Sequence, residues 1–201
     1  MSRLFLNSMG LNTKDGAKQI KHSMEVQGVT DLSDQKVFVV SYTPYGIDDF
    51  IIKNCIEILG FQSKNIFLSK DGIPEADINY VYVTEGNVFQ VLNYMRENEL
   101  VDYIRDMILN NDQTDYIGSS AGAMIAGKDI YFGLDFDKNN VGMTDFKSLN
   151  LFDGTIIPHY EKENLEMYKS NTEEEILNSY ENIYCVGNED VFVLDIPCRK
   201  C

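Results

Sequence analysis

The feature that most constrains the fold is a short apolar run that passes directly into a helix-forming run through a turn of small residues. Residues 115–126 read Asp-Tyr-Ile-Gly-Ser-Ser-Ala-Gly-Ala-Met-Ile-Ala, which predicts a buried strand followed at once by a helix. A turn this sharp requires small residues, because the strand and the helix must approach closely. Gly118 and Gly122 stand two residues before and two after Ser120. The pattern therefore predicts Ser120 at the tip of a strained turn.

This turn has the G-x-S-x-G pattern of a nucleophile elbow. The N–H of Ala121 would begin the helix, where free N–H groups and the helix dipole can stabilise an oxyanion. A serine nucleophile needs a base, and histidine suits that task near neutral pH. Of the two histidines, His22 falls on the polar face of a predicted helix, whereas His159 follows an apolar strand and Pro158. Ser120 and His159 are therefore the candidate nucleophile and base.

The residues leave two candidates for the acid that orients the base. Asp135 would give the order Ser, acid, His, as in α/β-hydrolases, and Glu189 would give the order Ser, His, Glu. Gly86 follows another predicted strand and is the candidate for a second oxyanion donor, because glycine lets the backbone approach a substrate carbonyl closely.

Strands and helices alternate through the first two-thirds of the chain. The run Lys36-Val-Phe-Val-Val-Ser-Tyr42 is typical of a strand covered on both faces. Two last strands, 182–186 and 191–194, flank a turn and are predicted to form a hairpin. The pattern predicts an α/β fold with a mostly parallel sheet, and the length suits one domain, 1–201. The other expected strands cover 4–6, 65–69 and 78–84, and the expected helices cover 17–26, 47–58, 88–95 and 100–108.

Composition excludes several classes of partner. The net charge of −15 opposes binding to nucleic acid or an anionic membrane. No run approaches the roughly 20 apolar residues of a membrane span, and the N-terminus lacks the apolar region of a signal peptide, so we expect a cytoplasmic protein. With two histidines and no H-E-x-x-H motif, we expect no metal and no cofactor.

Four segments together resemble the S51 serine peptidases, a family that includes aspartyl dipeptidase (peptidase E) and, more distantly, cyanophycinase. They are Gly86-Asn87-x-Phe89, Gly118-Ser-Ser-Ala-Gly-Ala123, Leu149-Asn-Leu-Phe152 leading to Pro158-His159-Tyr160, and Gly187-x-Glu189. The resemblance implies a three-layer αβα sandwich similar to the class I glutamine amidotransferases. It also implies Ser120 as nucleophile, His159 as base, Glu189 as acid, and Gly86 with Ala121 as oxyanion donors. Asp135 falls on a family aspartate as well.

The first functional hypothesis is a serine exopeptidase that hydrolyses short peptides as a monomer or homodimer. The alternatives are a catalytically silent protein that binds a small molecule on the same fold, and an esterase or amidase that uses Asp135. Glu85 and Asn87 are expected to contact the substrate. Glu85 stands where dipeptidase members have glycine, and the arginine that these members carry after the histidine is missing. Both departures predict a preference for neutral or basic N-terminal residues.

Overall fold

A computed structural model describes residues 1–42, 48–111, 113–161 and 174–197. Its main sheet has six strands in the order β3-β2-β4-β5-β1-β8. Their bounds are β1 Ser2–Asn7, β2 Val37–Val40, β3 Ile66–Leu68, β4 Tyr80–Val83, β5 Asp115–Ser119 and β8 Val191–Ile196. All neighbouring pairs are parallel except β1 with β8. The predicted mostly parallel α/β sheet is confirmed.

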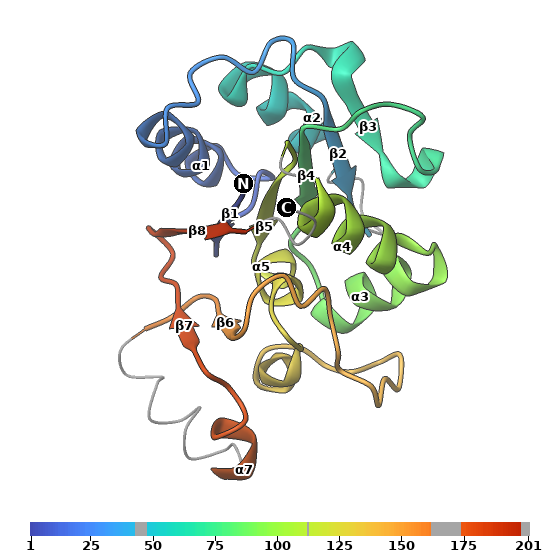
Figure 1. Cartoon of the computed structure of the whole chain (residues 1–201), viewed down its shortest axis with the longest axis vertical. Coiled ribbons are helices and arrows are strands. Elements are labelled where there is room, and N and C mark those ends of the chain that lie inside the picture. Colours follow the sequence, from blue (N-terminus) through green and yellow to red (C-terminus); the bar gives the residue numbers. More distant parts are fainter. Residues whose placement is uncertain (43–47, 112, 162–173, 198–201) are drawn as a thin grey trace.

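Helices cover both faces of this sheet, because side chains of successive strand residues point to opposite faces. On one face, Phe5, Val39 and Tyr82 pack with α1 (Lys14–Val26) and with α2 (Asp48–Asn54), which continues as a π-helix over Cys55–Leu59. On the other face, Leu6 and Val83 pack with α3 (Val88–Glu97), α4 (Leu100–Asn110) and α5 (Ala121–Ala126). In Figure 1, α1 and α2 lie in the upper half and α3 and α5 in the lower half. The three-layer sandwich is confirmed.

Two short 3-10 turns, Ser63–Asn65 and Ser69–Asp71, precede α5. The short elements after α5 are a 3-10 turn at Tyr131–Asp135, the strands β6 (Thr155–Ile157) and β7 (Ile183–Cys185), and the single-turn helix α7 (Glu174–Leu177).

The predicted hairpin between the last two strands is wrong. β7 pairs in parallel with β6 in a separate two-stranded sheet, and β8 pairs with β1 at the edge of the main sheet. The physical reason is the length of the available partner. β1 offers β8 a register of six residue pairs, from Ser2 with Ile196 to Asn7 with Val191, whereas β7 has only three residues. The turn between β7 and β8 therefore carries the chain from one sheet to the other.

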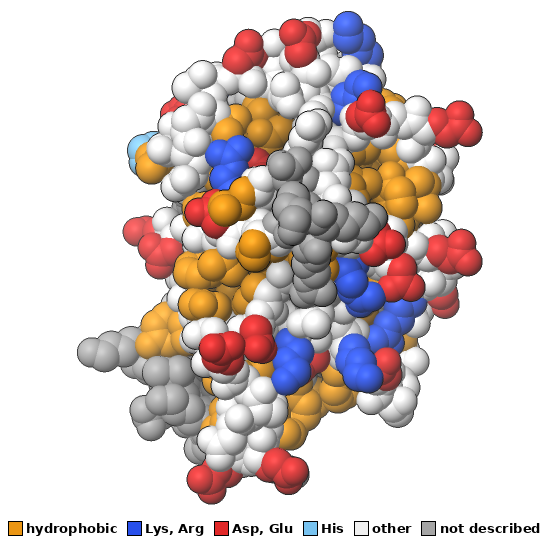
Figure 2. Space-filling model, viewed as in Figure 1, with side chains coloured by type: hydrophobic (Ala, Val, Ile, Leu, Met, Phe, Trp, Pro, Cys, Tyr) orange, Lys and Arg blue, Asp and Glu red, His pale blue; other side chains and the backbone are white. Residues whose placement is uncertain are grey.

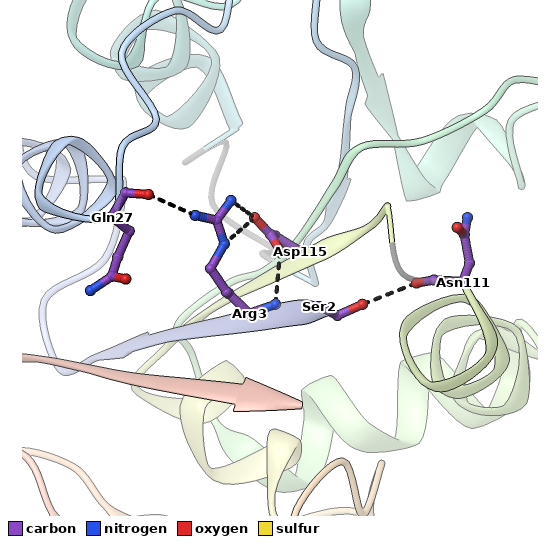
Figure 3. A network of polar contacts seen from close by, with 5 residues as sticks. All are labelled: Ser2, Arg3, Gln27, Asn111 and Asp115. Atoms are coloured by element: carbon purple, nitrogen blue, oxygen red, sulfur yellow. Dashed lines mark hydrogen bonds and ion pairs between the residues drawn. The ribbon is translucent and has the colours of Figure 1, made fainter. Parts of the chain in front are cut away.

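An ion pair fixes the register of β1 against β5 at their N-terminal ends. Figure 3 shows the guanidinium of Arg3 on the carboxylate of Asp115, with 2.6 Å between Arg3 Nη2 and Asp115 Oδ2. The Arg3 N–H donates to the other oxygen of Asp115 at 2.8 Å, and Ser2 Oγ donates to the Asn111 carbonyl at 3.0 Å. Because the strands are parallel, this register places Asn7 beside Ser119 at their C-terminal ends.

Acidic side chains are distributed over the surface. Figure 2 shows Asp and Glu side chains scattered around the visible face; several Lys and Arg side chains lie below its centre, and others lie in its upper part. Within the described ranges, no helix has the length and apolar character required to cross a membrane.

Candidate active site

Ser120 lies between the last residue of β5 and the first residue of α5, in a strained backbone conformation. Its φ of 48° and ψ of −105° are rarely adopted by residues with a side chain. The predicted need for small neighbours is confirmed. A Cβ atom on Gly122 would lie 2.0 Å from the Val83 carbonyl oxygen, and one on Gly118 would lie 2.6 Å from the Gly122 carbonyl oxygen. The sequence thus forms a strained strand-to-helix turn in which only glycine fits at positions 118 and 122.

Hydrogen bonds from neighbouring strands hold this turn. The Ser120 N–H donates to the Asn7 carbonyl at 2.8 Å, and the Gly122 N–H donates to the Thr84 carbonyl at 3.1 Å. The buried hydroxyl of Tyr116 donates to the Gly122 carbonyl at 2.7 Å. The strained conformation is therefore fixed from three strands, β1, β4 and β5, as a strained residue requires.

The structure brings the predicted base to the predicted nucleophile. His159 Nε2 lies 3.0 Å from Ser120 Oγ, a hydrogen-bonding distance. His159 follows β6 and Pro158, and its φ of 53° is also positive. The other histidine, His22, is exposed on α1, as predicted. The two strained residues in this site thus come from segments 39 positions apart.

The second imidazole nitrogen contacts an amide rather than a carboxylate. His159 Nδ1 lies 2.7 Å from Oδ1 of Asn188, in the turn between β7 and β8. An amide oxygen only accepts, so Nδ1 carries the proton and Nε2 is free to accept from Ser120. The neighbouring Glu189 is exposed, and within the described part of the chain no hydrogen bond joins it to His159. The contact expected of Glu189 is therefore made by Asn188.

The other predicted acid, Asp135, ends a 3-10 turn and is exposed, and a second carboxylate follows two residues later. Asp137 is half-buried, and its Oδ2 accepts the Val88 N–H at the start of α3 at 2.7 Å. The pKa of Asp137 is raised, chiefly by burial, and the Val88 bond and the charge of His159 act in the opposite direction without outweighing it. Asp137 is not among the candidate acids predicted from the sequence, although it lies only two residues after the candidate Asp135.

The two predicted oxyanion donors lie on segments that are joined to each other. Ala121 is the first residue of α5, and Gly86 follows β4 with a φ of 140°, a conformation that favours glycine. The bond from the Gly122 N–H to the Thr84 carbonyl fastens the start of α5 to the segment that carries Gly86. This connection keeps both N–H groups at the same end of the parallel sheet.

Of the two residues predicted to bind substrate, Glu85 has one carboxylate oxygen hydrogen-bonded within the protein, and Asn87 has both of its side-chain polar atoms hydrogen-bonded there. The Glu85 carboxylate is buried against Gly10, and its Oε2 accepts the Tyr82 hydroxyl at 2.7 Å. Burial raises the pKa of Glu85. Asn87 caps α3, because its Oδ1 accepts the Gln90 N–H at 3.1 Å, and its Nδ2 donates to the Lys138 carbonyl at 3.0 Å. These contacts give both residues a structural role that the sequence did not predict.

Acidic, histidine and cysteine side chains do not gather into a metal site in the part of the chain that the structure describes, where no group of three or more could hold an ion.

The sequence and the structure are both similar to known proteins. The family model described as Peptidase family S51 matches residues 29–195. Peptidase E of Actinobacillus pleuropneumoniae serotype 5b (strain L20) is 30% identical over 162 residues, which are 74% of this chain and 65% of that protein. The Drosophila melanogaster protein named "Probable alpha-aspartyl dipeptidase" is 28% identical over 153 residues, 72% of this chain and 62% of that protein. The chain thus matches less than two-thirds of the length of these relatives.

A solved structure has the same fold. The crystal structure of a protein from Listeria monocytogenes EGD-e superposes with a TM-score of 0.64 at 22% identity, covering 98% of this chain and 99% of that chain. At this identity the similarity supports the architecture of the main sheet and its helices.

Proposed function

Because this chain belongs to peptidase family S51, we propose that it is a serine peptidase that hydrolyses short peptides from their N-terminal end. One observation carries the proposal: a continuous chain of contacts from Ser120 Oγ to His159 Nε2 at 3.0 Å and from His159 Nδ1 to Asn188 Oδ1 at 2.7 Å. Nucleophile, base and orienting group stand in the relation that acyl transfer requires. The names of the relatives support peptides as the substrate class.

In the first half of the reaction, His159 Nε2 takes the proton of Ser120 as Oγ attacks the carbonyl carbon of the scissile peptide bond. The carbonyl oxygen becomes an oxyanion, which the N–H groups of Ala121 and Gly86 stabilise. His159 then gives the proton to the departing amine, the peptide C–N bond breaks, and an acyl-enzyme remains on Ser120. In the second half, water replaces the amine and the same proton transfers release the acid.

In a Ser-His-Asp triad, one carboxylate both orients the imidazole and stabilises its charged form. A neutral amide can perform only the first of these tasks. The Asn188 amide oxygen fixes the tautomer and the ring plane of His159, but it carries no charge to stabilise the imidazolium. We therefore assign only orientation to Asn188. Asp137, a half-buried carboxylate whose pKa the charge of His159 lowers, is the candidate for charge stabilisation.

Substrate preference follows from charge at the site. No arginine stands between His159 and Cys198, so a substrate carboxylate lacks a planar bidentate partner in this segment. The buried Glu85 carboxylate does not contribute to the preference as first expected, but the half-buried Asp137 carboxylate interacts electrostatically with His159. Peptides with neutral or basic N-terminal residues are therefore the proposed substrates, ahead of those that begin with aspartate.

The test is intact-mass labelling with a serine-reactive phosphonate, together with turnover of dipeptides that begin with acidic, neutral or basic residues. The parent protein should gain one phosphonate and hydrolyse the neutral and basic members. Ser120→Ala should lose both properties, and His159→Ala should lower both rates by several orders of magnitude, since triad members act as a unit.

Failure of the parent to be labelled or to cleave any dipeptide would favour the catalytically silent binding protein. Rates of Ser120→Ala within about tenfold of the parent would remove Ser120 from the mechanism, because loss of a triad nucleophile costs far more.

A further inference from the structure

Two adjacent residues at the end of β1 connect the segments that carry the proposed nucleophile and base. Asn7 accepts the Ser120 N–H through its carbonyl at 2.8 Å and the Ser119 hydroxyl through its Oδ1 at 2.7 Å. Its Nδ2 donates to the Met9 carbonyl, which fixes the amide orientation. The carbonyl and both side-chain polar atoms of Asn7 are thus used, and two of these three groups hold the turn at Ser120.

The next residue, Ser8, makes the corresponding contacts to the other half of the site. The His159 N–H donates to Ser8 Oγ at 2.8 Å, and Ser8 Oγ donates to the Val186 carbonyl at 2.8 Å. The same Val186 carbonyl accepts the Tyr160 N–H at 3.0 Å. Ser8 is almost fully buried, with 2% of its surface exposed, so water does not replace these bonds if the hydroxyl is lost.

The Ser8 contacts lie where the backbone is strained. The φ of 53° at His159 is unfavourable for a residue with a Cβ atom and persists only if surrounding bonds maintain it. Ser8 Oγ supplies the acceptor for the N–H of this strained residue. Through Val186 it also holds the turn that carries Asn188 two residues later. A single hydroxyl therefore sets both the backbone of the base and the position of its orienting amide.

We propose that Ser8 is a positioning residue, whose hydroxyl holds His159 and the Asn188 turn in register with the elbow that Asn7 holds. The expected loss of kcat rests on the proposed function. The expected displacement of the His159 imidazole does not depend on it. Without the hydroxyl, the His159 N–H loses its acceptor and the backbone relaxes toward a negative φ. The imidazole then moves away from Ser120 Oγ, while the surfaces that bind substrate remain in place.

The test compares Ser8→Ala with a matched control, Ser148→Ala. Ser148 is also buried, and its hydroxyl donates to the Gly127 carbonyl at 2.7 Å, with no contact to the proposed catalytic residues. Both variants lose a buried serine bond to a backbone carbonyl, so both should lower the thermal midpoint. Only Ser8→Ala should lower kcat, by about tenfold to a hundredfold with KM within about twofold, because misplacement of a catalytic group by about 1 Å has effects of this size.

A spectroscopic readout makes the test independent of activity. The chain has only two histidines, His22 and His159, so its imidazole C–H proton resonances can be assigned with one His22→Gln variant. Ser8→Ala should shift the resonances of His159 and leave those of His22 unchanged, whereas Ser148→Ala should shift neither. If Ser8→Ala does not fold, Ser8→Cys retains the volume with a weakly hydrogen-bonding thiol and should give the same result.

The outcomes separate this inference from the proposed function. His159 resonances that remain unchanged in both Ser8 variants would overturn the positioning role, whatever the activity. Shifted resonances in a protein without peptidase activity would support the positioning role and remove the proposed function. In an active parent, equal losses of kcat in Ser8→Ala and Ser148→Ala would show that Ser8 acts on general stability and would overturn the inference.

Discussion

At the scale of single residues, the proposed mechanism depends on which side chain faces His159 Nδ1. Both Asn188 and Glu189 are exposed, but Asn188 lies 2.7 Å from this nitrogen, whereas no hydrogen bond joins Glu189 to it within the described residues. An amide oxygen provides the geometric part of the orienting role without the charge, as in the Cys-His-Asn arrangement of papain-like proteases. The tautomer with the proton on Nδ1 is then maintained by one neutral hydrogen bond.

We expect Asn188→Ala to lower kcat by about tenfold to a hundredfold, because the imidazole would lose the bond that fixes its ring plane. Asn188→Asp should retain most of the rate, since a carboxylate oxygen accepts the same proton. Glu189→Ala is the matched control in the same exposed turn and should stay within about threefold of the parent. Steady-state kinetics on one dipeptide measures all three. A larger loss for Glu189→Ala than for Asn188→Ala would return the orienting role to Glu189.

At the scale of secondary structure elements, the elbow depends on how closely α5 approaches β4. Gly122 is in the first turn of α5, and its Cα faces the Val83 carbonyl with no room for a side chain. This contact is with backbone atoms, so a rotamer change cannot relieve a clash. The position of α5, and with it the N–H of Ala121, is therefore fixed by the absence of a side chain at Gly122.

Gly122→Ala should destabilise the protein by about 3 kcal/mol, at the upper end of what overpacking costs, and should lower the phosphonate labelling rate because α5 must shift. Gly28→Ala serves as the control. Its φ is 82° but a Cβ there meets no atom within 4 Å, so only the conformational cost of about 1–2 kcal/mol applies and labelling should be unchanged. Urea unfolding and labelling kinetics test both. A Gly122→Ala protein as stable as Gly28→Ala would contradict the steric explanation.

At the scale of the whole molecule, a buried carboxyl group links stability to pH. Glu85 lies between Gly10 and Tyr82, and one of its oxygens, Oε1, is buried with no hydrogen-bond partner among the described residues. Burial raises the pKa of this carboxyl above its ordinary value of 4.5. The folded protein therefore binds the Glu85 proton more tightly than the unfolded chain does.

The sign of the pH effect follows from this difference. Where the folded state binds more protons, stability falls as pH rises. The contribution of Glu85 is fully present below pH 4.5 and is lost as pH rises through the raised pKa of the folded state. Glu85→Gln removes the ionisation, so its free energy of unfolding relative to the parent should increase with pH above 4.5 and level off above the raised pKa.

Urea unfolding of parent and variant across this pH range measures the difference. Glu25→Gln on the exposed surface of α1 is the control, and its difference from the parent should stay constant with pH. A pH-independent difference for Glu85→Gln would show that the Glu85 carboxyl is not buried in solution as it is in the structure.

The sequence by itself determined the features that depend on local sterics and periodicity. Gly118, Ser120 and Gly122 predicted a sharp strand-to-helix turn because only small residues permit a strand to pass directly into a helix, and the structure has such a turn. Alternating strands and helices predicted the parallel sheet, because each pattern has its own period. His159 could be distinguished from His22 because His22 falls on a polar helix face.

Only the tertiary structure decided the features that depend on contacts between distant segments. Which of Asn188 and Glu189 faces the imidazole depends on the backbone of a turn that has no periodicity. Asp137 rather than Asp135 bonds to the start of α3 because the chain leaves the 3-10 turn in that direction. The partner of β8 depended on the length of β1. Ser8 meets His159 across 151 residues of sequence, a contact that no local pattern encodes.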